Sequence, residues 1–283
     1  MQLTRLIRLV DDAHYPEGPL WVDGRLHWVE FGRDAVMCLR PDGTPRVLWS
    51  SPSVGPAAVT AGADVDLWVT GYGDNSLIRI GRDGSLLEVH DRDADDQVLL
   101  GPNDLVLHRE GGLYFTLSGV FELDAPVQGR VCLRTVAGEI RTVADGIHYA
   151  NGVALSPDGE RLFVSEHFKN RVLVFDLRPD GSLSGRRVFA ELASAAPPPA
   201  VTDPKLGPDG LKVTTSGAVL VAQFGGGRII VLDPDGTLRG VIALPFQYVT
   251  NVGFGATEQT VYFTAFASEE PPCRGAVLEA RLH

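Results

Sequence analysis

Side chains that could hold a hard divalent cation occur at widely separated points of this sequence. Glu17 and Asp209 supply carboxylates, while Asn103, Asn151 and Asn251 supply amide oxygens. Two carboxylates with neutral oxygen ligands suit such a cation, and without one the carboxylates would repel and one pKa would rise. Taken singly, each residue is more often part of a turn than a ligand, because Asn-Gly and Asp-Gly pairs are common in turns. These residues therefore predict a site only if the fold brings them together.

A repeated strand pattern provides elements that could do so. Six short runs of β-branched and aromatic residues have anchors 40 to 57 residues apart, a spacing typical of four-stranded propeller blades. The anchors are Trp28, Trp68, Phe115, Val164, Val221 and Phe263. Pro-Asp-Gly turns recur between the runs, and no segment has a helical period. The sequence therefore predicts an all-β, six-bladed β-propeller in a single domain, residues 1–283.

The residue that opens the first strand of each unit lies 11 to 13 positions before its anchor. These six residues are Glu17, Ala57, Asn103, Asn151, Asp209 and Asn251. Because the first strand of every blade lines the central channel, we expect the six to form one ring at its mouth. Glu30 and Glu166 occupy equivalent positions at the ends of their strands; the sequence leaves open whether they support the ring or only end the strands.

Two segments fall outside the six units. The last unit, from Asn251 onward, has room for three strands, and the opening segment 3–10 reads as a strand without a unit. We expect the N-terminal strand to join the last blade and close the ring, which removes an exposed sheet edge. The insertion 193–206 contains three consecutive prolines, which lack amide donors, and is predicted to be an extended loop near a channel mouth.

Composition narrows the class of partner. A formal net charge of −11 disfavours nucleic acid and anionic membranes. No run approaches the roughly 18 apolar residues of a membrane span, and the start lacks the apolar core of a signal peptide. The three cysteines are far apart and form no C-x-x-C pair. We expect a cytoplasmic protein, a monomer or small homo-oligomer, that acts on a small molecule.

Four segments resemble the SMP-30/gluconolactonase/LRE-like family in order and spacing. They are residues 15–19 (YPEGP), 102–105 (PNDL), 151–159 (NGVALSPDG) and 208–211 (PDGL). The resemblance covers nearly the whole chain and implies a six-bladed propeller that hydrolyses lactones with one divalent ion. Calcium or zinc is the ion it implies, with magnesium or manganese as alternatives. The family's metal ligands fall on Glu17, Asn151 and Asp209, and a further Asn that contacts metal or substrate falls on Asn103.

The resemblance also suggests roles in catalysis. The ion would polarise the lactone carbonyl and stabilise the oxyanion that forms. Asp209 would be the general base, directly or through a relayed water, and Asn103 would orient the substrate. His14, Tyr15, His148 and Tyr149 lie near the predicted mouth and could shape the pocket. Of the residues around it, Tyr15, His148 and His167 are expected to contact the substrate. No G-x-S-x-G elbow is present, which disfavours a serine hydrolase.

Two positions depart from the family's sugar lactonases. Gly101 stands where relatives often have an Arg, and Leu117 stands where many have an Asp. Both changes predict a pocket less polar than that of a sugar lactonase. Two other functions stay open: condensation, cyclisation or isomerisation of a larger metabolite, as in strictosidine-synthase-like propellers, and a metal-stabilised propeller that binds without catalysis.

Overall fold

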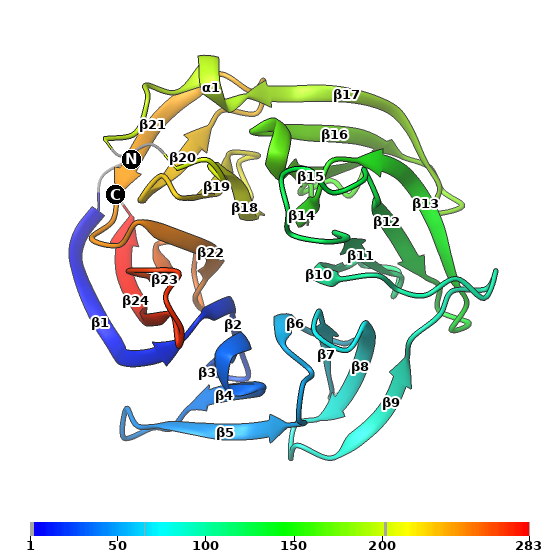
Figure 1. The fold of residues 1–283 in the computed structure, drawn as a ribbon, viewed down its shortest axis with the longest axis horizontal. Helices are drawn as coiled ribbons and strands as arrows, with labels where there is room; N and C mark the ends of the chain where they lie inside the picture. The colour runs from blue at the N-terminus through cyan, green and yellow to red at the C-terminus, as the bar shows by residue number, and fades with distance from the viewer. Residues whose placement is uncertain (1–2, 65, 201–202, 283) are drawn as a thin grey trace.

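The computed structural model describes residues 3–64, 66–200 and 203–282. Within these ranges, six four-stranded antiparallel sheets stand around a central opening (Figure 1). Each sheet is one blade, so the predicted six-bladed β-propeller is confirmed. No helix in the described ranges is long and apolar enough to cross a membrane.

The first three blades follow the chain in order. Blade 1 consists of β2 (Pro16–Val22), β3 (Arg25–Glu30), β4 (Ala35–Leu39) and β5 (Pro45–Ser50). Blade 2 consists of β6 (Pro56–Ala61), β7 (Asp66–Gly71), β8 (Ser76–Gly81) and β9 (Leu86–His90). Blade 3 consists of β10 (Pro102–Leu107), β11 (Leu113–Leu117), β12 (Gly129–Arg134) and β13 (Ile140–Ile147).

The other three blades complete the ring. Blade 4 consists of β14 (Ala150–Leu155), β15 (Arg161–Glu166), β16 (Arg171–Leu177) and β17 (Leu183–Glu191). Blade 5 consists of β18 (Gly207–Val213), β19 (Val219–Phe224), β20 (Arg228–Leu232) and β21 (Leu238–Ala243). Blade 6 consists of β22 (Tyr248–Phe254), β23 (Thr260–Phe266), β24 (Arg274–Leu282) and β1 (Leu3–His14). Short helical turns follow β3, β15 and β17: η1 (Phe31–Arg33), η2 (His167–Lys169) and α1 (Leu192–Ala195).

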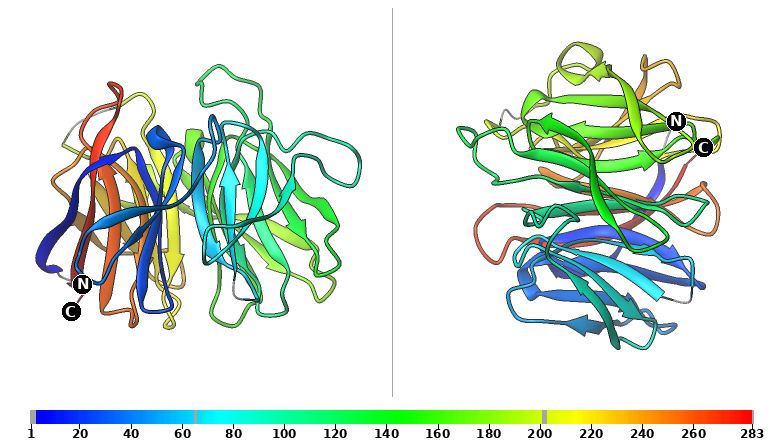
Figure 2. Two further views of the ribbon diagram at one scale, coloured as in Figure 1. Left: turned by 90° about the horizontal axis from the view of Figure 1, so that it is seen from below. Right: turned by 90° about the vertical axis from the view of Figure 1, so that its right-hand side faces the viewer.

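The ring closes as expected. Strand β1 pairs antiparallel with β24, from Leu3 opposite Leu282 to His14 opposite Arg274. The strand runs to His14, beyond the expected end at Val10. The two ends of the described chain therefore lie side by side at one edge of the disc (Figure 2).

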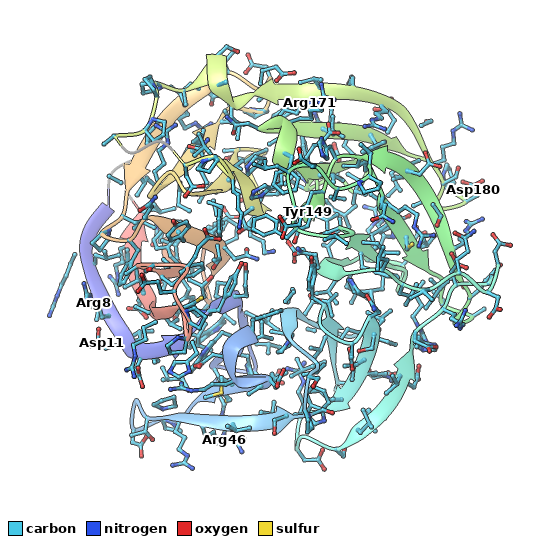
Figure 3. The ribbon with its side chains drawn as sticks, in the orientation of Figure 1. Arg8, Asp11, Arg46, Tyr149, Arg171 and Asp180 are labelled. Atoms are coloured by element: carbon cyan, nitrogen blue, oxygen red, sulfur yellow. The ribbon has the colours of Figure 1, made fainter. Side chains whose placement is uncertain are left out.

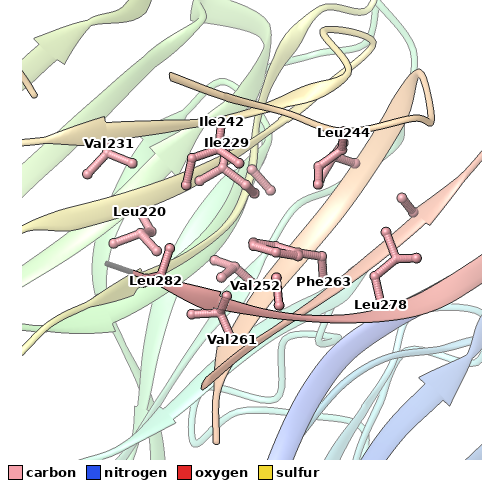
Figure 4. Packing of buried hydrophobic residues seen from close by; sticks show 14 of the residues in the cluster. Leu220, Ile229, Val231, Ile242, Leu244, Val252, Val261, Phe263, Leu278 and Leu282 are labelled. Atoms are coloured by element: carbon pink, nitrogen blue, oxygen red, sulfur yellow. The ribbon is translucent and has the colours of Figure 1, made fainter. Parts of the chain in front are cut away.

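The core lies between blades, because blades pack face to face and bury both faces of their middle strands. Figure 4 shows the interface of blades 5 and 6, where Leu220 and Ile229 of one blade face Val252 and Phe263 of the other. Four aromatic residues of the repeated strands, Trp28, Trp68, Phe115 and Tyr262, are buried in these interfaces. This packing fixes neighbouring inner strands relative to one another, and these strands carry the candidate site.

Strand register moves one residue of the expected ring. In blade 5, the two bulge residues after Pro208 are Asp209 and Gly210, and Leu211 then pairs with Val221. In blade 6 the corresponding two residues are Thr250 and Asn251; the register breaks at Thr250, and Asn251 pairs with Thr264. The register equivalent in blade 6 is therefore Thr250 rather than Asn251, although the amide of Asn251 still donates a hydrogen bond to the ring residue Glu17, 3.3 Å away. The bulge hides this shift, because it breaks the two-residue period of the strand.

The same comparison corrects the second anchor. Val69 pairs with Val59 as Phe115 pairs with Leu105, so the structural equivalent of Phe115 is Val69 rather than Trp68.

The proline-containing insertion forms no strand where it is described. It starts inside the short helix α1 rather than as an extended loop, and residues 196–200 and 203–206 are irregular. Residues 201–202 of this insertion lie outside the described ranges. The carbonyl of Lys205, near the end of the insertion, approaches the ring of His167, which places this part of the loop beside the channel.

Candidate functional site

Five ring residues meet at one central cavity of about 170 Å³. They are Glu17, Ala57, Asn103, Asn151 and Asp209, from the inner strands of blades 1 to 5. Residues up to 192 positions apart in the chain therefore become neighbours, as the repeat predicts. Thr250, the sixth ring residue, is buried and donates its hydroxyl hydrogen bond to the carbonyl of Pro16, 2.7 Å away.

A larger cavity of about 710 Å³ lies between blades 3 and 4. Turns at the other ends of these strands line it, including residues 108–110, 159–161 and 176–181. Acidic and basic side chains alternate around it without converging on one point. The central cavity is the better candidate site because buried ionisable groups converge there.

Neighbouring blades fix the backbone of the ring. The hydroxyl of Ser165 donates to the carbonyl of Asp209, and that of Thr116 donates to the carbonyl of Asn151, both at 2.7 Å. Each hydroxyl belongs to the blade before the one it holds. Such hydrogen bonds couple the position of a ring residue to the packing of the adjacent blade.

Glu166 holds the segment that leads into the ring in blade 4. Its buried carboxylate accepts a 2.8 Å hydrogen bond from the backbone N–H of His148 and a 2.6 Å hydrogen bond from Arg171. Between His148 and the inner strand, Tyr149 adopts a left-handed conformation with φ of 64°. The chain thus turns sharply, just before Asn151 enters the cavity.

Blade 1 has the same arrangement of a buried glutamate, a backbone N–H and an arginine. Glu30 accepts a 2.9 Å hydrogen bond from the N–H of His14 and a 2.7 Å hydrogen bond from Arg33, and Tyr15 has φ of 48°. Neither Glu30 nor Glu166 lines the cavity. The structure thus resolves the alternative left open by the sequence: both carboxylates position the chain that carries Glu17 and Asn151.

The floor of the cavity combines two buried carboxylates. Glu17 and Asp209 are 8% and 5% exposed. Burial raises the pKa of Glu17 well above its usual value, and the nearby Asp209 carboxylate acts in the same direction. Burial likewise raises the pKa of Asp209, while a hydrogen bond from Asn151 opposes that shift. No Lys or Arg side chain lines this cavity in the described part of the chain.

This donor set fits one divalent cation. Two carboxylates without a cationic partner are costly to bury together, and a divalent ion would remove that cost. In the described ranges, no three His, Cys, Asp or Glu side chains converge as a metal-binding group, so amide oxygens would have to complete the ligand set. Asn151 and Asn103 line the same cavity and supply such oxygens.

The walls of the cavity are aromatic. Seven rings line it, and we call them the aromatic collar: Tyr15, Phe31, Tyr72, Phe121, Tyr149, His167 and Phe224. Figure 3 shows Tyr149 beside the central opening, far from the peripheral Arg46 and Asp180. The collar stands above a polar floor, an arrangement that suits a ligand with one polar end and one apolar end.

The structure places Tyr15, Asn103 and His167 at the cavity, as predicted, but not His148. The ring of His148 packs against Phe168 outside the cavity, and both its ring nitrogens are buried without a hydrogen-bond partner among the described residues. The left-handed turn at Tyr149 explains the difference, because it directs residue 149 toward the channel and residue 148 away from it.

His167 is held on both sides of its ring. Nδ1 lies 3.1 Å from the carbonyl oxygen of Pro208, and Nε2 lies 2.9 Å from that of Lys205. Burial lowers the pKa of His167 to about 4, although both carbonyls oppose the shift. A neutral ring donates to one of these two oxygens.

Four collar residues were not singled out from the sequence: Phe31, Tyr72, Phe121 and Phe224. The strand repeat could have located three of them. Counting three residues onward from the structural anchors Trp28, Val69 and Val221 reaches Phe31, Tyr72 and Phe224. The same count from Val164 reaches His167. Phe121 has no such signal, because it comes from the irregular segment between β11 and β12.

The two departures from the family pattern have different structural contexts. Gly101 has φ of 63°, and a Cβ atom there would lie 2.8 Å from the carbonyl oxygen of Gly119 and 3.0 Å from the ring of Tyr72. The Tyr72 ring thus crowds the position where relatives carry Arg. Leu117 is fully buried in the core between blades 2 and 3 and does not line the cavity.

Comparison with known proteins gives the family. The model of the SMP-30/gluconolactonase/LRE-like region matches residues 15–267, a range that contains all five cavity ring residues. The chain belongs to this family.

Curated proteins similar to this chain include lactonases. L-arabinolactonase of Azospirillum brasilense is 27% identical over 81% of this chain and 73% of its own length. Pentonolactonase of Haloferax volcanii is 27% identical over 91% of this chain and 84% of its own. Among solved structures, a gluconolactonase from Xanthomonas campestris superposes with a TM-score of 0.82 at 28% identity, covering 99% of this chain and 90% of the other.

Proposed function

We propose that this protein is a divalent-metal-dependent lactonase whose substrate is less polar than a sugar lactone. The observation that carries the proposal is the pair of buried carboxylates, Glu17 and Asp209, without a cationic side chain at the floor of a small cavity. The lactonase relatives supply the reaction class. The aromatic walls support the less polar substrate.

Glu17, Asn151 and Asp209 would hold the ion, with calcium or zinc as first choices and magnesium or manganese as alternatives. When bound, the ion supplies Lewis-acid polarisation of the lactone carbonyl. Asn103 donates a hydrogen bond that orients the substrate, and the Tyr15 and His167 rings contact its body. His148 has no part in this assignment, since its ring lies outside the cavity.

Asp209 takes a proton from the attacking water as the water oxygen bonds to the carbonyl carbon. The bond between that carbon and the ring oxygen then breaks, and the proton passes to the ring oxygen. The product is the open hydroxy acid. Because Asp209 also binds the cation in this assignment, it acts on the attacking water either directly or through a relayed water.

We further propose that the chain works as a single domain in the cytoplasm, as a monomer or small homo-oligomer, without nucleic-acid or membrane partners. The net charge of −11 and the three free, separated cysteines support this. Processing of a larger metabolite is less well supported, because a cavity of about 170 Å³ is below the usual size of sites for drug-sized ligands.

The test is hydrolysis of a lactone panel by the purified protein, before and after chelation and with each of the four metals added back. We expect activity to disappear on chelation and return with metal, and Asp209→Ala to lose about 1,000-fold or more in kcat with an unchanged circular dichroism spectrum. Asp235→Ala, at an exposed turn far from the cavity, is the matched control and should keep full activity.

Full activity in Asp209→Ala would refute the base assignment. Full activity after complete removal of metal would refute metal dependence. Metal uptake with a raised melting temperature but no turnover of any lactone would identify a binding propeller instead.

A further inference from the structure

The collar carries few polar atoms: the hydroxyls of its three tyrosines, Tyr15, Tyr72 and Tyr149, and the ring nitrogens of His167. The Tyr72 hydroxyl donates to the carbonyl of Gly119, 2.9 Å away, and both ring nitrogens of His167 face backbone carbonyls. No Ser, Thr, Gln, Lys or Arg side chain is among the described residues that line the cavity. Hydrogen-bonding capacity is therefore concentrated at the floor, around Asn103, Asn151 and the two carboxylates.

Phe121 completes the collar from the irregular segment 118–128, between β11 and β12. Its ring centroid lies 4.9 Å from that of Tyr149, 5.3 Å from that of His167 and 5.7 Å from that of Phe224. It thus joins three rings that come from blades 4 and 5. The segment around it is exposed, including Val120, which is 49% exposed.

Tyr72 ties this segment to the ring. Its hydroxyl holds the carbonyl of Gly119, two residues before Phe121, and Gly119 has φ of 80°. Beside it, the hydroxyl of Ser118 donates to the carbonyl of Ala150 in blade 4. The position of Phe121 over the cavity is therefore set by contacts from blades 2 and 4 as well as by its own blade.

The size of the cavity limits the ligand to a small molecule. An apolar cavity of about 150 Å³ is large enough to bind benzene, and this one measures about 170 Å³. The space accommodates a lactone ring at the polar floor together with one flat apolar group against the collar. Offset and edge-to-face contacts with the surrounding rings favour an aromatic group there.

From these features we propose that the site selects small lactones fused to, or carrying, an aromatic or similarly flat apolar ring, and that Phe121 is a specificity-determining residue. This inference rests on the proposed lactonase function for the reactive end of the ligand. A polyhydroxylated lactone of the same ring size would place several hydroxyls against aromatic walls that offer few hydrogen-bonding atoms. Each hydroxyl left without a partner costs about tenfold in affinity.

The first experiment compares kcat/KM of the metal-loaded enzyme for a benzo-fused δ-lactone, δ-valerolactone and glucono-δ-lactone. We expect the benzo-fused lactone to be preferred over glucono-δ-lactone by about 100-fold or more, since several hydroxyls lose their water. Phe121→Ala should lower kcat/KM for the benzo-fused lactone about tenfold or more, while changing that for glucono-δ-lactone less than threefold. Val120→Ala, in the same segment but outside the cavity, is the matched control and should change neither.

A second measurement separates this inference from the proposed function. Binding of the benzo-fused lactam and of gluconolactam, which replace the lactone ester by an amide, is measured by calorimetry on the metal-loaded protein and on Phe121→Ala. The benzo-fused lactam could bind more tightly than gluconolactam in a way that depends on Phe121, while no lactone is hydrolysed. That result would contradict the lactonase proposal and support the ligand class. If glucono-δ-lactone is hydrolysed and gluconolactam is bound as well as or better than their benzo-fused counterparts, the proposed ligand class is wrong. The lactonase proposal would still stand.

If Phe121→Ala fails to fold, Tyr72→Phe provides the same test. It keeps the ring of residue 72 but removes the hydrogen bond to Gly119. A loss of selectivity between the two lactones supports the inference, and unchanged selectivity in every folded variant contradicts the role of Phe121.

Discussion

At the scale of single residues, burial sets the chemistry of the site. Glu17 accepts one hydrogen bond from the N–H of Gly18 and one from the amide of Asn251, at 3.1 and 3.3 Å. Two such bonds do not compensate the loss of water around a carboxylate that also faces Asp209. A more stable floor could be built from neutral side chains, so the two acids cost stability, a cost that the proposed cation would remove.

Another buried ionisable residue, His27 on β3, gives a prediction about stability. It is 5% exposed and its Nδ1 is buried without a hydrogen-bond partner in the described ranges. Burial lowers its pKa to about 4, and the nearby Arg82 adds to the shift. Above about pH 7.5 the ring is neutral in both folded and unfolded chains, and its contribution to stability is fully present. As the pH falls toward 4, only the unfolded chain gains the proton, so stability is lost.

We therefore expect His27→Leu to reduce the loss of stability between pH 7.5 and pH 4 by about 2 kcal/mol. The measurement is the free energy of unfolding in urea at a series of pH values for both proteins. Above pH 7.5 the two curves should run parallel. Parallel curves across the whole range would show that His27 becomes protonated as readily in the folded protein.

At the scale of elements, the repeat predicts most of the architecture and part of the site. Glu17, Asn103, Asn151 and Asp209 were located because each opens a strand whose sequence pattern is regular. Asn251 was misplaced by one residue, because the bulge in β22 cannot be read from a two-residue alternation. Phe121 could not be located, because the path of an irregular segment depends on tertiary contacts that no local pattern encodes.

His148 shows a second limit of prediction from local sequence. Its neighbour in sequence, Tyr149, reaches the cavity, but a positive φ at a non-glycine residue reverses which side chain faces the channel. Glu166 holds this turn from 18 residues away through the N–H of His148. Local sequence therefore predicts that polar residues gather at this mouth, while a distant carboxylate decides which of them enter it.

The dependence of the site on Glu166 can be tested directly. Glu166→Ala leaves the N–H of His148 without its acceptor and Arg171 without its buried partner. We expect a loss of about 2–4 kcal/mol in the free energy of unfolding, together with weaker binding of the metal, because Asn151 loses its fixed position. Urea unfolding and calorimetric metal titration measure the two effects.

The control uses the same arginine. Glu191 also pairs with Arg171, at 3.5 Å, but its side chain is 50% exposed. Glu191→Ala should change stability by less than about 1 kcal/mol and leave metal affinity unaltered. Unchanged metal affinity in a folded Glu166→Ala protein would show that the turn is fixed without Glu166.

At the scale of the whole molecule, closure of the ring makes the site possible, since ring residues from blades 1 and 5 meet only if all blades are in place. Blade 6 contains one strand from the start of the chain and three from its end. Removing residues 1–13 would expose the edge of β24, whose residues 275–278 are buried. We expect such a protein to aggregate or to lose its cooperative unfolding transition, because an unpaired edge and a broken ring remain.

A circular permutant separates the need for closure from the need for this particular chain order. Leu3 lies opposite Leu282, so a short Gly/Ser linker can join the ends. Opening the chain at the exposed turn between β4 and β5 makes β5 the first strand and β4 the last. Blade 1 would then close as blade 6 does now, with one N-terminal and three C-terminal strands.

We expect this permutant to unfold cooperatively, with a free energy of unfolding within about 2 kcal/mol of that of the original chain. It should also keep its metal affinity, because exposed turns tolerate new ends. A permutant that folds but binds no metal would contradict the view that ring geometry alone assembles the floor of the cavity.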